Sequence, residues 1–258
     1  LGARLREQYG PAAFITSHNT CAHIDHLDGV LSGVRNWLAD DGVFGCEVGY
    51  FLDVYENTWF DTIYHEHLDY HTVGPFQALL SRVGMEGLAV LRVSPQGGSI
   101  RMFAQKAGGP HAREASIAQL TDLERIRELD NPKTFERFGQ RIGAVGAELR
   151  GLLAGLKADG KSIAGYCAQT KSTTLLTHFQ LGRHELDFIV DDNPLKHGLF
   201  SPVTHIPVFA TEELYRRHPD YVLILAWNFA EPIMAAHRAY TDRGGKFVLP
   251  MPVARIIE

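Results

Sequence analysis

The hydrophobic and polar positions follow two rhythms in the first part of the chain. Residues 1–10 show the mixed pattern of the end of a helix, closed by a glycine, which indicates that the chain begins inside a domain. Residues 12–16 are an apolar run that leads into the polar cluster SHNT, typical of a buried parallel strand that ends in a functional loop. Helical spacing over residues 24–38 and the strand-like VFGCEV at 43–48 complete a predicted strand–helix–strand unit.

The middle of the chain changes from strands to helices. A helix is predicted over residues 73–83, and the runs LAVLRVS and SIRMFAQKA, joined by the turn PQGG, predict an antiparallel hairpin. Residues 110–159 form a nearly continuous helical stretch that is interrupted at Asp130-Asn131-Pro132. This pattern predicts two connecting helices.

Strands and helices alternate again after Lys161. The predicted strands are SIAGYC, LDFIVDDNP, HIPVFA, YVLILAWN and KFVLP, and the predicted helices begin near Lys171, Thr211 and Phe229. Such alternation is typical of a doubly wound parallel sheet. The expected fold class is therefore α/β, with a partial Rossmann-like sheet, linker helices and a second Rossmann-like domain at the C-terminus.

Composition excludes several function classes. With 258 residues, 45% hydrophobic and 21% charged, the chain has enough apolar material for a globular core. Its net charge of −5 and the lack of a basic stripe argue against nucleic-acid binding. No apolar run approaches the ~20 residues that span a bilayer, and no signal peptide is evident, so we expect a soluble, cytoplasmic protein. The three cysteines, Cys21, Cys46 and Cys167, are widely spaced and predicted to be reduced thiols.

The segment DTIYHEHLDYH, residues 61–71, is the strongest candidate for chemistry. Its side chains offer a base, a carboxylate to orient it, and hydrogen-bond donors for an oxyanion, with Tyr64, His65, Glu66 and His67 as the central group. A solvated loop with polar aromatics is the plainer alternative. A metal site is also conceivable for His-x-His, but no carboxylate stands at ligand spacing, so no metal is expected in this chain.

His23 gains interest from its position. It follows the strand that ends near residue 16, while the next strand ends near Glu47, ahead of the DTIYHEHLDYH segment. Because adjacent parallel strands end at the same edge of a sheet, His23 and Tyr64 are expected to lie close together.

The turn GYCAQTKSTT, residues 165–174, joins a strand to a helix. A helix start with Lys171, Ser172 and Thr173 suits an anion such as a diphosphate. As a dinucleotide fingerprint the turn is weak, because only Gly165 is present and Cys167 stands at the second glycine position. A capped strand-to-helix turn without a ligand is the alternative.

Several segments together carry a family resemblance across nearly the whole chain. They are NTCAHIDH (19–26), LADDGVFGCEV (38–48), FDTIYHEHLDY (60–70), GGSIRMFA (97–104), IAGYCAQTKSTTLL (163–176), VDDNPLKHGLFSPVTHIPV (190–208) and DYVLILAWNF (220–229). In these segments the sequence resembles the S-adenosylmethionine-dependent C-methyltransferases that act on nucleotide-linked 4-keto-deoxysugars in antibiotic and surface-glycan pathways.

The resemblance implies a three-part protein, with an N-terminal zinc-binding module, a methyltransferase domain and a C-terminal domain, and the sugar nucleotide between the last two. The zinc module and the glycine-rich loop for the methyl donor are not found in this sequence. We therefore expect residues 1–109 to be the C-terminal half of a class I methyltransferase domain, 110–160 to be connecting helices, and 161–258 to be the C-terminal domain. The first strand then becomes an exposed edge, and the chain alone is expected to bind the donor poorly and to be less soluble than a longer form.

Roles for individual residues also follow from the resemblance. His67 would be the base, Tyr64 and His23 would donate to the enolate oxygen, and Glu66 would fix an imidazole or a sugar hydroxyl. The residues expected to bind ligands are His18, Asn19 and Thr20 for S-adenosylmethionine, and His65, Lys171, Ser172 and Thr173 for the sugar nucleotide. His65 is also a reserve candidate for the base.

The implied reaction is transfer of a methyl group to a carbon beside the ketone of a dTDP-4-keto-deoxysugar, with C3 favoured and C5 possible. Two alternatives stay open: a non-catalytic protein that binds a sugar nucleotide or a partner, and an NAD-dependent epimerase or dehydrogenase. The expected partner is the nucleotide-sugar substrate, and the sequence says nothing of the oligomeric state.

Overall fold

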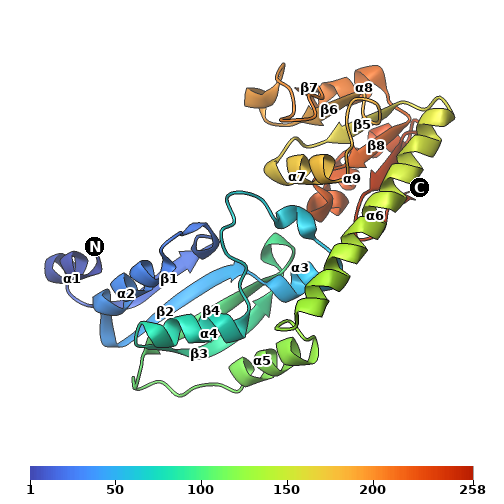
Figure 1. The fold of residues 1–258 in the computed structure, drawn as a ribbon. Helices are drawn as coiled ribbons and strands as arrows, with labels where there is room; N and C mark the ends of the chain where they lie inside the picture. Colours follow the sequence, from blue (N-terminus) through green and yellow to red (C-terminus); the bar gives the residue numbers. More distant parts are fainter. Residues whose placement is uncertain (258) are drawn as a thin grey trace. The chain divides into compact units, whose positions relative to one another are not determined.

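The computed structural model describes residues 1–257, which divide into two compact α/β units (Figure 1). Unit 1 comprises Leu1–Glu56 and His65–Phe135, and unit 2 comprises Asn57–Tyr64 and Glu136–Glu258. The predicted fold class is confirmed, since each unit contains a sheet and helices. Within the described part of the chain, no helix combines the length and the apolar character that a membrane span requires.

Unit 1 is built on a four-stranded sheet in the order β1-β2-β4-β3. Strands β1 (Ala12–His18) and β2 (Leu38–Gly49) pair in parallel, and α2 (Leu27–Trp37) connects them, which confirms the predicted strand–helix–strand unit. The hairpin of β3 (Met85–Val93) and β4 (Ser99–Lys106) is antiparallel, as predicted, and β4 lies between β2 and β3. The helices α1 (Gly2–Tyr9), α3 (Phe51–Asn57) and α4 (Val73–Arg82) complete the first part of this unit; α3 was not predicted.

Strand β1 lies at the edge of its sheet and is paired only with β2. Its side chains are half-buried or exposed, and Phe14 is 56% exposed. The expected exposed edge is therefore confirmed, whereas the buried strand inferred from the apolar pattern is wrong for this chain. Apolar residues in a strand record a preference for burial, but the cover itself has to come from a neighbouring element.

The helical region contains two helices of different character. Helix α5 (Ser116–Ile126) packs within unit 1, where Ile117 joins the core. Helix α6 (Pro132–Ala158) begins at Pro132, as predicted, and all but its first turn belongs to unit 2. The compact units thus divide the chain at different residues from the expected segments 1–109, 110–160 and 161–258, whose functional assignment stays a prediction.

Unit 2 contains a six-stranded sheet in the order β10-β9-β8-β5-β6-β7. The strands are β5 (Ile163–Tyr166), β6 (Phe188–Asp191), β7 (Val208–Ala210), β8 (Tyr221–Ile224), β9 (Lys246–Leu249) and β10 (Arg255–Ile257). All neighbouring pairs are parallel except β9 with the unpredicted β10. Counted from β5, the spatial order is 3-2-1-4-5-6, which confirms a doubly wound sheet.

The strand order of unit 2 reverses between β5 and β8. Helix α7 (Thr170–His178) follows β5, and the one-turn helix η5 (Trp227–Phe229) follows β8 and leads into α9 (Ala230–Ala236). Helices α8 (Glu212–Arg217) and α10 (Arg238–Thr241) complete the unit. In open α/β sheets, ligands bind beyond the carboxyl ends of the strands at such a switch point.

Candidate functional site

Residues 63–72, called the YHEH segment below, form an irregular connection between the one-turn helix η2 (Phe60–Thr62) and α4. Its end is tied to unit 1 by a parallel bridge between Tyr50 and His71 and by the N–H of Phe51, which donates to the carbonyl oxygen of His71 at 3.0 Å. Tyr64 is the last residue of the segment that belongs to unit 2, and His65 is the first that belongs to unit 1.

Within unit 1, the structure brings His23 together with two residues of this segment. His23 ends the one-turn helix η1 (Cys21–His23), and its Nδ1 lies 2.7 Å from the carbonyl oxygen of Glu66. Its ring packs edge-on against that of His67, with 4.9 Å between the centroids. His23 thus lies beside Glu66 and His67, whereas its expected closeness to Tyr64 stays a prediction. The catalytic roles of these residues stay predictions.

The contact of His23 with Glu66 determines its tautomer. A carbonyl oxygen only accepts hydrogen bonds, so Nδ1 of His23 must carry the hydrogen in this contact. Nε2 is then an acceptor while the imidazole is neutral and becomes a donor only in the imidazolium form. The expected role of His23 as a donor to an enolate oxygen therefore requires the charged ring.

The other residues of the segment differ in exposure. The side chains of His65 and Glu66 are 82% and 55% exposed, and His65 Nε2 lies 3.9 Å from Glu66 Oε1. Such an exposed pair contributes little to stability. Tyr64 is half-buried. The exposed carboxylate of Glu66 is available for a ligand, whereas its backbone holds His23.

The residues expected to bind the methyl donor lie at the carboxyl end of β1. His18, Asn19 and Thr20 are all exposed. The backbone N–H of Asn19 donates to the carbonyl oxygen of Glu47 at 2.9 Å, which fastens this turn to the end of β2. Asn19 takes the left-handed conformation, with φ of 50°. Ligands of α/β sheets bind at such strand ends, so the position fits a donor site, and the contacts themselves stay predictions.

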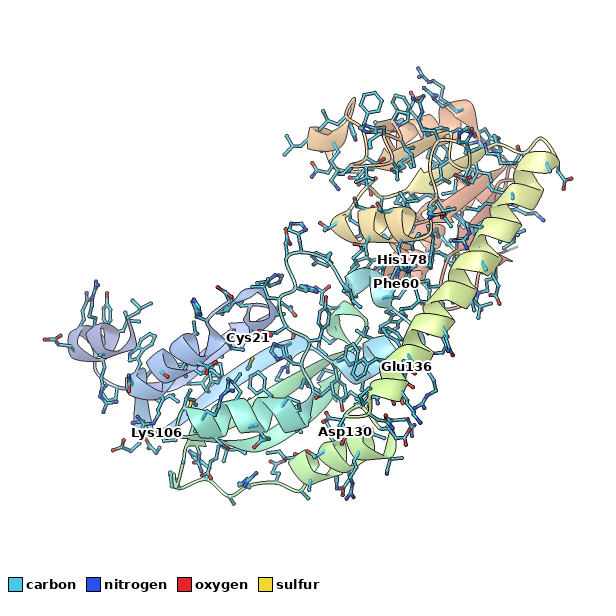
Figure 2. The ribbon with its side chains drawn as sticks, viewed as in Figure 1. Cys21, Phe60, Lys106, Asp130, Glu136 and His178 are labelled. Carbon is cyan, nitrogen blue, oxygen red and sulfur yellow. The ribbon has the colours of Figure 1, made fainter. Side chains whose placement is uncertain are left out.

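Two cysteines form a buried pair beneath this loop. Figure 2 labels Cys21, whose Sγ lies 3.2 Å from that of Cys46, and both thiols are free. The hydrogen bond with Cys46 lowers the pKa of Cys21 to about 7, against the opposing effect of burial. The same contact raises the pKa of Cys46. Reduced thiols were predicted, but the pairing of residues 25 positions apart was not visible in the sequence.

In unit 2, the turn after β5 has the shape expected of a ligand loop. Cys167 takes φ of 78°, a conformation that favours glycine, at the second glycine position of a dinucleotide fingerprint. Lys171 is half-buried, and its Nζ lies 5.9 Å from the ring centroid of Trp227. Thr173 is half-buried. Ser172 is only 2% exposed, and its hydroxyl donates to the carbonyl oxygen of Gln169, so only its backbone remains for the predicted anion contact.

The structure adds two residues that the sequence analysis did not single out. Asp61 is fully buried, and its Oδ2 accepts a hydrogen bond of 2.6 Å from Nε1 of Trp227. Burial raises the pKa of Asp61 to about 6. Asp61 opens the segment DTIYHEHLDYH, but an aspartate in a polar stretch gives no sign of burial.

The acidic residue at the end of β6 bears on the dinucleotide alternative. Asp191 Oδ2 accepts from the N–H of Ala168 at 2.7 Å and from Nζ of Lys196 at 2.9 Å, and Oδ1 accepts from the N–H of Asn193. These bonds lower the pKa of Asp191 although burial opposes the change. A carboxylate at this place binds the ribose in dinucleotide enzymes. Here it closes the turn, which disfavours NAD binding.

Metal ligation has no support in residues 1–257, because no three His, Cys, Asp or Glu side chains gather in an arrangement suited to an ion. Zinc is an expectation for the N-terminal module of the family and concerns residues outside this sequence.

Comparison with known proteins places these features in a family. The profile of the family described as "C-methyltransferase C-terminal domain" matches residues 94–252. A curated relative, "C-methyltransferase NovU" of Streptomyces niveus, is 35% identical over 257 residues, which is 100% of this chain and 61% of that protein. The alignment with the relative includes the YHEH segment, which lies outside the profile match. The chain belongs to the C-methyltransferase family.

Proposed function

We propose that this chain carries the part of an S-adenosylmethionine-dependent C-methyltransferase that binds and activates the methyl acceptor, a dTDP-4-keto-deoxysugar. The observation that carries the proposal is the contact of His23 with Glu66 and His67 at the carboxyl ends of β1 and β2. A base next to a polarising group suits removal of a proton beside a ketone. Family membership supports methyl transfer to carbon, and the sugar nucleotide and C3 come from the resemblance alone.

In this proposal the two imidazoles have different tasks. His67, in neutral form, takes the proton from the carbon beside the ketone. His23, held through Nδ1 by Glu66, donates from Nε2 to the developing enolate oxygen in its imidazolium form. S-adenosylmethionine, when bound, supplies the electrophilic methyl group.

Solvent deuterium exchange tests this function without the methyl donor. We expect the chain, incubated in D2O with a dTDP-4-keto-6-deoxyhexose, to exchange hydrogen at one carbon next to the ketone, because the enolate reprotonates from solvent. Proton NMR identifies the carbon. A folded chain that binds the sugar nucleotide and catalyses no exchange would contradict the proposal and favour the non-catalytic binding protein.

Binding of the nucleotide should depend on Lys171. We expect Lys171→Met to weaken binding of dTDP by about 10- to 100-fold, since a hydrogen bond to a charged group contributes about 1.5–3 kcal/mol. Isothermal titration calorimetry measures the change. Lys161→Met is the matched control, because Lys161 pairs with Asp220 at 3.2 Å. Equal affinities of the two variants would remove Lys171 from the nucleotide site.

A further inference from the structure

We propose that Asp61 is a positioning residue of the acceptor site: its buried carboxylate holds Trp227 at the β5/β8 switch point and fixes the segment that carries Tyr64. The proposal rests on the proposed function for its catalytic consequence. The physical hold on Trp227 is tested independently of that function.

The segment Asn57–Tyr64 is part of unit 2 and is attached to it on two sides. Figure 2 labels Phe60 beside His178, and their ring centroids are 5.0 Å apart, while Phe179 lies 4.8 Å from Phe60. Trp59 packs against Trp227 at 5.1 Å. Between these aromatic contacts, Asp61 makes the polar connection to Trp227. The backbone three residues before Tyr64 is thus held firmly.

The burial of the Asp61 carboxylate lowers the stability of the fold. Its side chain is fully buried, and its pKa is raised because the cost of burial outweighs the hydrogen bonds from Trp227 and the backbone and the charge of Lys171. A buried carboxylate whose interactions do not offset the cost of burial destabilises a fold. A packed apolar residue or an amide would hold the segment at lower cost, so the charge itself calls for a functional reason.

The functional reason for a charge at Asp61 is that it favours the charged form of Lys171. Burial lowers the pKa of Lys171, and the negative charge of Asp61 opposes that effect. Lys171 belongs to α7 after β5, and its Nζ lies 5.9 Å from the ring centroid of Trp227, which belongs to the connection after β8, so Asp61 reaches both arms of the switch point through Trp227. Two further buried polar atoms on the same two connections, Nε2 of Gln169 and Oδ1 of Asn228, have no hydrogen-bond partner. Unpartnered buried polar atoms on both arms of a switch point indicate a site prepared for a polar ligand.

Asp61→Asn separates positioning from a merely structural role through its effect on stability. The pKa of Asp61 is raised to about 6 from 3.8, so the native state binds the proton more tightly than the unfolded chain, and stability falls as the pH rises from about 4 to about 6 and stays lower above that. We expect the variant to melt at a higher temperature than the wild type at pH 8, with the difference vanishing near pH 4. A residue that serves only the fold would show a lower melting temperature at pH 8.

Tryptophan fluorescence, measured on the whole chain without any ligand, tests whether Asp61 fixes the position of Trp227. We expect a transition with a midpoint near pH 6 that Asp61→Asn and Trp227→Phe abolish. Among the contacts described, the charge of Lys171 acts on Asp61 and the ring of His178 packs against Phe60, and both residues lie on α7. His178→Gln is the control for the histidine and should keep the transition. If the wild-type chain shows no transition, or if the transition persists in the Asp61→Asn variant, Asp61 does not fix the position of Trp227.

The catalytic consequence is measured in the deuterium exchange assay. We expect Asp61→Asn and Trp227→Phe to lower the exchange rate at saturating sugar nucleotide by about 10- to 100-fold, the usual cost of misplaced groups. Asp122→Asn, an exposed acid on α5, should match the wild type. Full exchange in Asp61→Asn overturns the positioning role. If the wild type shows no exchange, the proposed function is wrong, and the fluorescence transition alone then tests whether Asp61 fixes Trp227.

Discussion

Replacing His67 by asparagine is expected to lower the rate of deuterium exchange into the keto sugar by about 10²- to 10⁴-fold, the range that general-base assistance contributes. Asparagine preserves the size and polarity of the side chain but cannot accept a proton near neutral pH. His67 packs against His23 at 4.9 Å, so its loss removes the base while the hydrogen bond of His23 to Glu66 remains. Proton NMR of the sugar at saturating concentration measures the rate.

Two further histidine variants make this result specific. His26→Asn should exchange at the wild-type rate, because the side chain of His26 is 92% exposed and follows η1. His65→Asn tests the reserve base on the same loop. A loss below about tenfold for His67→Asn would contradict its assignment, and a large loss for His65→Asn alone would transfer the role to that ring.

Replacing Glu124 by alanine should cost about 3–5 kcal/mol of the free energy of unfolding of unit 1, the usual effect of breaking a buried charged network. Glu124 is 6% exposed and accepts from the hydroxyl of Tyr50 at 2.9 Å and from the N–H groups of Val73 and Gly74 at 2.6 and 3.1 Å. The last two N–H groups lie at the start of α4 and have no acceptor within the helix. Alanine removes the acceptor of all three donors, of which those of Tyr50 and Val73 are buried.

Urea unfolding with a probe confined to unit 1 measures this effect. Trp37 belongs to unit 1, whereas Trp59 and Trp227 belong to unit 2, so a background with phenylalanine at the latter two positions isolates the signal. Asp122→Ala is the control, because the exposed Asp122 lies on the same helix and pairs only with Arg125 at 2.9 Å among the contacts described; it should change stability by less than about 0.5 kcal/mol. A similar small change for Glu124→Ala would show that α5 is merely a connector.

The elements were predictable wherever local pattern and local contacts agree. Helix α2 and its flanking strands, the β3/β4 hairpin and the start of α6 at Pro132 follow from periodicity and turn chemistry. The role of α5 was not predictable. Its apolar residues suit any helix, and the decisive contact joins Glu124 to Val73, 51 positions away. The sequence carries no local sign of such a capping interaction at long range.

The candidate site, like the fold, was predictable from the sequence only in part. By itself, the sequence determined the alternating α/β plan and directed His23 toward the part of the chain at Tyr64, because strand ends that follow one another in a parallel sheet lie on one edge. Its contacts with Glu66 and His67 came only from the tertiary structure. Only the tertiary structure decided the tautomer of His23, the pairing of Cys21 with Cys46 and the burial of Asp61 against Trp227. Burial and hydrogen-bond partners depend on residues that are distant along the chain, and only folding brings them into contact.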